Sequence, residues 1–150
     1  MNKAEIAKQL KKISVAFPSK KLYETKEDLE LLIDLWDECL GNYTEEVVSM
    51  AIRNYVIENT YAPTIGDIEK EIQEIKKDWK NQTNTLSSWI RKDEEDIAWH
   101  EKIVQTRGDK AEDSCGYLCP EELENKKKYL EKAKKELKNL EEFKFYEGER

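Results

Sequence analysis

Two cysteines and the single histidine are the residues of this sequence best suited to chemistry. Cys115 and Cys119 form a Cys-x3-Cys pair, and His100 precedes them. Thiolate and imidazole ligands suit zinc, but a structural zinc site uses four ligands and these residues supply three. We therefore expect no metal and no cofactor, and we interpret the cysteine segment as a turn with free thiols between two helices. The third cysteine, Cys39, is predicted to be a small core residue.

Other signatures of catalysis are missing from the sequence. None of the 5 glycines has a neighbour at the spacing of a phosphate-binding loop, and no Gly-Lys-Ser/Thr sequence occurs. His100 has no serine or cysteine near it in a nucleophile setting. The many carboxylates follow helical spacing and are interpreted as solvated helix faces. We expect a protein that is not an enzyme.

Charge and composition point to a helical protein that binds other proteins. Charged residues make up 39% of the chain, apolar residues 38%, and the net charge is −7. An acidic surface argues against direct nucleic-acid binding, since phosphate contacts need positive charge. No apolar run is long enough to span a membrane and the amino-terminal residues lack a signal-peptide core, so a soluble, cytoplasmic location in a host cell is expected.

The first half of the chain predicts four amphipathic helices that form a small domain over residues 1–80. Thr25, Thr44 and Thr64 are predicted caps at the starts of the last three helices. Apolar residues recur at intervals of three and four, which places them on one face of each helix. Trp36 and Trp79 belong to these faces and are expected in the core.

The second half predicts a different arrangement. Residues 81–85 form a polar break and are expected to be a linker, and residues 86–150 are expected to form a carboxyl-terminal helical region. One helix is predicted from 86 to 105 and another from 121 to 143, with leucines repeating every seven residues in the last helix. That repeat predicts a helical hairpin arm or a coiled-coil seam, which leaves open a homodimer through residues 121–143. Gly148 and the charged end of the chain are expected to fray. The fold class is thus all-α, with a small four-helix domain followed by a long helix or a helical hairpin.

The order of elements in residues 1–80 resembles the phage replicative-helicase loader/inhibitor family. The likeness lies in an aromatic-x-Pro-Thr-Ile-x-x-Ile turn preceded by three helices of matching type. The matching residues are Trp36, Tyr43, Ala51, Pro63, Thr64, Ile65 and Ile68. The resemblance implies a phage DNA-replication accessory protein that binds a hexameric, DnaB-like replicative helicase, restrains it and delivers it to an origin complex, where an origin-binding protein is a further partner.

Two alternatives remain open at this stage. In one, the helices on either side of the Pro63-Thr64 turn form a helix-turn-helix DNA-binding adaptor, although the second of them carries glutamates among its lysines. In the other, the chain is a dimeric structural or inhibitory phage protein that pairs through its last helix.

The partner-binding surface is expected after residue 85. Apolar residues there are too sparse for a second core, and an apolar helical surface left uncovered is typical of a docking site. The candidate partner-binding residues are Trp89, Ile97, Trp99, Leu123, Leu130 and Leu137.

Overall fold

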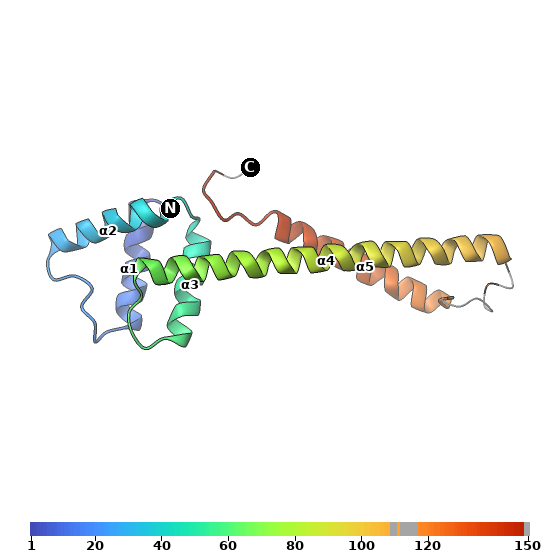
Figure 1. Ribbon diagram of the computed structural model, residues 1–150, viewed down its shortest axis with the longest axis horizontal. Coiled ribbons are helices and arrows are strands. Elements are labelled where there is room, and N and C mark those ends of the chain that lie inside the picture. Colours follow the sequence, from blue (N-terminus) through green and yellow to red (C-terminus); the bar gives the residue numbers. More distant parts are fainter. Residues whose placement is uncertain (109–110, 112–116, 149–150) are drawn as a thin grey trace. The chain divides into compact units, whose positions relative to one another are not determined.

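The structure, a computed structural model, describes residues 1–108, 111 and 117–148. These residues form five helices and no strand beyond one isolated β-bridge between Tyr43 and Tyr146. The helices are α1 (Lys3–Ala16), α2 (Lys26–Leu40), α3 (Glu45–Glu58), α4 (Ile65–Arg107) and α5 (Pro120–Glu141), labelled in Figure 1. The predicted all-α fold with a long helix after short ones is confirmed. Nowhere in this described part is a helix both long and apolar enough to cross a membrane.

The starts of the helices are held by side chains that replace the missing backbone partners of the first turn. The Thr25 hydroxyl accepts from Asp28 N at 3.1 Å, and the Asp28 carboxylate accepts from Thr25 N at 3.0 Å. At α4 the backbone amide and the hydroxyl of Thr64 both donate to Asp67, at 2.9 and 2.7 Å. Thr44 caps α3. The three predicted threonine caps are therefore confirmed.

The chain divides into two compact units. Unit 1 comprises residues 1–78 and 144–150, of which the structure describes those up to 148; unit 2 comprises residues 79–143. In unit 1 helix α1 packs against α2 and α3, and the start of α4 completes the core. Fully buried side chains from all four helices meet there, among them Ile6, Ile13, Leu40, Val47, Val48, Ile68 and Ile72.

Helix α4 runs without a break through residues 81–85, so the prediction of a linker there is wrong. The segment contains no Gly or Pro, and each of its residues costs at most about 0.7 kcal/mol relative to alanine in a helix. Its hydroxyl groups bond to carbonyls one turn earlier: Thr83 donates to Trp79 O at 2.9 Å and Ser87 donates to Thr83 O at 2.8 Å. A polar stretch is thus compatible with a continuous helix when its hydroxyl groups bond within the helix, to carbonyls one turn earlier.

Unit 2 is a helical hairpin made by the later part of α4 and by α5. Contacts pair rising residue numbers on α4 with falling numbers on α5, from Trp79 with Leu140 to Glu101 with Lys127, so the two helices are antiparallel. Trp79 is half-buried there, and its indole Nε1 donates to Leu140 O at 3.0 Å. The expectation that Trp79 belongs to the core of the first domain is therefore wrong: it lies in unit 2.

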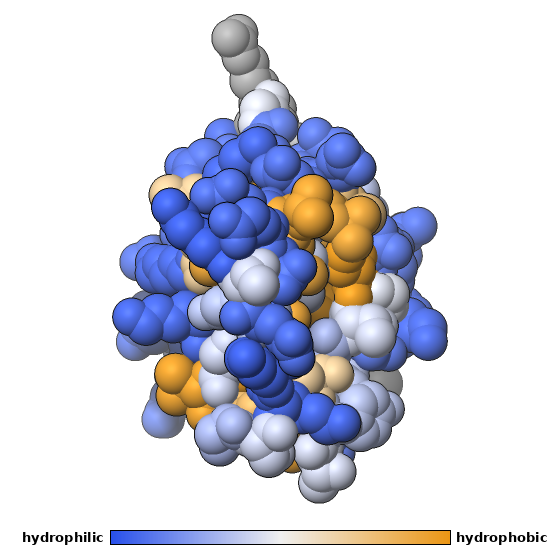
Figure 2. All heavy atoms as spheres, turned by 90° about the vertical axis from the view of Figure 1, so that its left-hand side faces the viewer, coloured by the Kyte–Doolittle hydropathy of each residue, from blue (hydrophilic) through white to orange (hydrophobic). Residues whose placement is uncertain are grey.

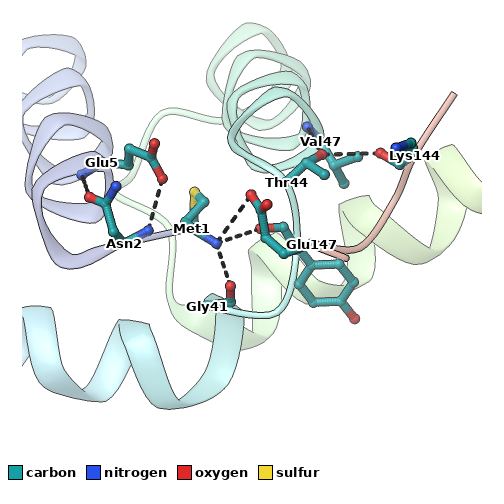
Figure 3. A network of polar contacts seen from close by, with 9 residues as sticks. Met1, Asn2, Glu5, Gly41, Thr44, Val47, Lys144 and Glu147 are labelled. Carbon is teal, nitrogen blue, oxygen red and sulfur yellow. Dashed lines mark hydrogen bonds and ion pairs between the residues drawn. The ribbon is translucent and has the colours of Figure 1, made fainter. Parts of the chain in front are cut away.

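The residues after α5 return to unit 1 as a short strap, residues 144–147 (Figure 3). Thr44 N donates to Phe145 O at 3.1 Å, and Glu147 N donates to Asn42 O at 2.9 Å. The rings of Tyr43 and Tyr146 stack at 5.1 Å between centroids. Phe145 is only 5% exposed. Residues 144–147 are therefore part of folded unit 1.

The surface of unit 1 carries several uncovered apolar side chains. Figure 2 shows them as separate patches between hydrophilic atoms on the face drawn. Leu31 and Leu35 are exposed on α2, and Cys39, one turn further on, is exposed as well. The prediction that Cys39 is a core residue is wrong, because the buried face of α2 is set by Trp36 and Leu40 instead.

Acidification is expected to destabilise the protein through the capping carboxylates. Hydrogen bonds from Thr64 N and its hydroxyl hold the pKa of Asp67 below its ordinary value, and those from Thr25 do the same for Asp28. A lowered folded-state pKa contributes stability that is complete above about pH 4 and is lost as the pH falls through the folded-state value. Glu71 acts oppositely, because burial raises its pKa.

Urea unfolding followed by circular dichroism at falling pH tests this expectation. The urea concentration at the unfolding midpoint should decrease as the pH is lowered from about 4 to about 2. The Asp28→Asn, Asp67→Asn double variant should show a smaller fall over that range, since it lacks the two titrating caps. A midpoint that stays constant or rises on acidification would contradict it.

Candidate partner-binding surface

The six candidate partner-binding residues fall into two groups on unit 2. Ile97 and Leu130 are buried with Ile90 in a hydrophobic cluster, and Leu123 and Leu137 pack against that cluster. These four residues hold α4 and α5 together. Trp89 and Trp99 lie outside the cluster, 65% and 46% exposed. The structure thus brings four of the candidates together as packing and leaves the two tryptophans at the surface.

Ion pairs on both sides of the cluster fix the register of the hairpin. Lys126 donates to Asp96 at 2.8 Å and lies 3.1 Å from Asp93, and Lys134 lies 2.9 Å from Glu94. Lys126 interrupts the apolar repeat of α5, and in the structure it occupies that position by binding carboxylates of α4. Hydrogen bonding to Lys126 keeps the pKa of Asp96 below its ordinary range, so Asp96 is charged at neutral pH.

The exposed tryptophans share one face of α4, which we call the tryptophan face. Its residues follow intervals of four and three and are Thr85, Trp89, Lys92, Asp96, Trp99 and Ile103. Such intervals return to the same side of a helix after each turn. Trp89 and Trp99 are about 15 Å apart along the axis, since each residue of an α-helix adds about 1.5 Å.

The tryptophan face has the chemistry of a docking surface. Two large rings offer apolar area together with an indole N–H, a combination that is enriched at the centres of protein interfaces. Lys92 is exposed on this face between the rings and can give orientation to a partner through its charge.

His100 contacts described residues that precede α5. His100 is buried, its Nδ1 accepts from Leu118 N at 3.2 Å, and its ring lies 5.1 Å from that of Tyr117. Cys119 is exposed at the start of α5, where its backbone N donates to Glu122 at 2.9 Å. Cys115 lies outside the described residues. No group of three metal-ligating side chains occurs among the residues that are described.

Comparison with known protein families gives a match for the first part of the chain. Residues 1–69 match the amino-terminal domain of the gp39P-like family, which is a phage helicase-related family. The match covers α1, α2, α3 and the first turn of α4, and it confirms the resemblance drawn from the Tyr61–Ile68 turn. Comparisons with curated proteins and with solved structures give no match.

Proposed function

We propose, on the premise that residues 1–69 match the amino-terminal domain of the gp39P-like family, that this protein binds a hexameric replicative helicase of the DnaB type. It restrains the helicase and delivers it to an origin complex, with an origin-binding protein as the partner there. It acts without catalysing a reaction, through protein contacts alone. The family match supports the association with a helicase; the contact surface is argued from unit 2.

The observation that carries the proposal is the tryptophan face of a folded hairpin. Trp89 and Trp99 remain exposed although the apolar side of α4 is already packed against α5. Packing of the hairpin therefore does not account for these two rings. A rigid helix that presents two aromatic anchors suits a groove of a partner, because little order has to be gained on binding.

The double variant Trp89→Ala, Trp99→Ala tests this assignment. Its affinity for the helicase should fall by about 2 kcal/mol, close to thirtyfold, since truncated tryptophan hot spots cost this much or more. Isothermal titration of the full-length chain into the helicase hexamer measures the change. Circular dichroism should stay as in the parent protein, because both side chains are largely exposed.

Tyr129→Ala is the matched control. Tyr129 is an aromatic residue of the same hairpin, 71% exposed on α5, and its removal should leave the affinity unchanged. An equal loss in both variants, or no loss in the double variant, would place the helicase contact elsewhere. Binding of duplex DNA in a low-salt shift assay would instead favour the helix-turn-helix alternative.

A further inference from the structure

A groove between α1 and α3 on unit 1 is not used by the proposed helicase contact. It is an open surface hollow of 360 Å³, with Ala16, Ile52 and Val56 among its lining residues. Ile57, at its edge, is 76% exposed. A second hollow of 410 Å³ shares Lys12 and Ala16 with the first and continues it along α1. We call the two hollows together the α1–α3 groove.

The rim of the α1–α3 groove is basic. Helix α1 carries four lysines and one glutamate, in a chain whose net charge is −7. Lys12 and Arg53 line the first hollow, and no acidic residue does. Lys12 donates to Ser49 at 2.8 Å and to Gln9 at 3.0 Å, so its head is held across the groove by neutral partners. Among the described carboxylates none lies within ion-pair distance of Lys11, Lys12 or Arg53.

We propose that the α1–α3 groove binds an acidic amphipathic peptide segment of a partner protein. Apolar side chains of the segment insert between α1 and α3, and its carboxylates meet Lys11, Lys12 and Arg53. Charge complementarity carries the assignment: these cations have no ion-pair partner among the described carboxylates, and they border apolar surface. The nearest acidic residues are Glu45 and Glu46, which line a neighbouring hollow with Ser49 and Arg53. Glu45 is already paired with Lys8 at 2.7 Å.

The shape of the groove argues against other occupants. A hollow of 360 Å³ lies near the lower end of the range for small-molecule sites, about 300–1,000 Å³. Two of its polar lining residues, Lys12 and Ser49, already bond to each other. Nucleic acid needs stacking rings beside its cations, and the lining residues include no aromatic side chain. One or two apolar side chains of a peptide fit the apolar lining residues Ala16, Ile52 and Val56 better than a cofactor or a nucleic acid does.

Fluorescence anisotropy with the full-length protein tests the proposal. The probe is a fluorescein-labelled peptide of about twelve residues, with leucines at intervals of three and four and aspartates between them. It should bind, and the Lys12→Glu, Arg53→Glu variant should weaken binding about tenfold or more, since like charges then face each other. The matched control Lys20→Glu, Lys21→Glu makes the same charge change at two exposed residues after α1 and should have little effect.

Two further peptides and an NMR titration complete the test. A peptide with serine in place of leucine should bind at least about tenfold more weakly, and so should one with lysine in place of aspartate. Amide shifts in an NMR titration should concentrate at Ser49, Arg53 and Ile57. Equal binding of the serine peptide, shifts elsewhere, or displacement of the probe by a single-stranded oligonucleotide would overturn the proposal. No helicase enters this test, so its result is independent of the proposed function.

Discussion

Phe145→Ala is expected to lower the free energy of unfolding of unit 1 by about 3–5 kcal/mol, the range for removing a buried phenylalanine side chain. Phe145 is 5% exposed although it lies only a few residues after α5. The ammonium group of Lys76 lies 5.6 Å from the centre of its ring, and Thr44 N donates to its carbonyl. Loss of the ring leaves a cavity under the strap, and the strap then loses its only fully buried anchor among residues 144–147.

Lys144→Ala is the control for the strap. Its side chain is exposed, and the contact that Thr44 makes at this position uses the Lys144 carbonyl, 3.2 Å from the hydroxyl, which alanine retains. Urea unfolding followed by circular dichroism should show a change within about 0.5 kcal/mol for this variant. If Phe145→Ala behaves like Lys144→Ala, the strap contributes nothing to the stability of unit 1.

The strap also limits which fragments of the chain are expected to be stable. A fragment that ends at residue 80 or 84 contains α1, α2 and α3 but lacks residues 144–147, which close unit 1 over the α2–α3 connection. Such a fragment is expected to be less stable than unit 1 in the full chain. Point substitutions within the full-length protein therefore give a cleaner assignment of the helicase contact than truncation does.

Local chemistry made the amino-terminal helices predictable. Thr25, Thr44 and Thr64 satisfy backbone amides within three residues, and the apolar spacing around Trp36 and Ile52 fixes which faces are buried. These signals need no knowledge of the rest of the chain. The strap gave no such signal, because its contacts are with residues about a hundred positions earlier. The density of aromatic residues at Phe143, Phe145 and Tyr146 was the one available clue.

The hairpin was only partly predictable for a related reason. The exposed positions of Trp89 and Trp99 agree with the sparse spacing of apolar residues, whereas the burial of Ile97 and Leu130 depends on a partner helix. The charged run from Arg91 to Asp96 separates the apolar residues of this part of α4. Three of its acids, Asp93, Glu94 and Asp96, are the ion-pair partners of Lys126 and Lys134, which flank the cluster. Sequence spacing alone does not show which charges will be matched across two helices.

Each of the two units carries one of the proposed binding surfaces. The tryptophan face on α4 is apolar and aromatic and belongs to unit 2, and the α1–α3 groove is apolar with a basic rim and belongs to unit 1. An accessory protein that restrains one partner and delivers it to another needs two separate contacts. The proposed helicase contact and the proposed peptide groove would supply them, and each can be removed without the other.

Leu130→Ala is expected to lower the stability of the hairpin by about 3 kcal/mol, within the range for buried leucines. Leu130 is 7% exposed and lies with Ile90 and Ile97 in the cluster that joins α5 to α4. The adjacent substitution Tyr129→Ala removes a side chain that is 71% exposed on the same helix, and it should change stability by about 0.5 kcal/mol or less. Hydrogen exchange at the amides of α5 measures the difference, since opening of the hairpin exposes them together.

The outcome separates an intramolecular hairpin from pairing between copies of the chain. If α5 packs on its own α4, faster exchange in Leu130→Ala should be independent of protein concentration. Protection that rises with concentration in the parent protein, and is lost in Leu130→Ala, would show instead that the leucine seam of α5 joins two chains. In that case the ion pairs of Lys126 and Lys134 would also form between copies, and substitution of either lysine would lower the dimer affinity.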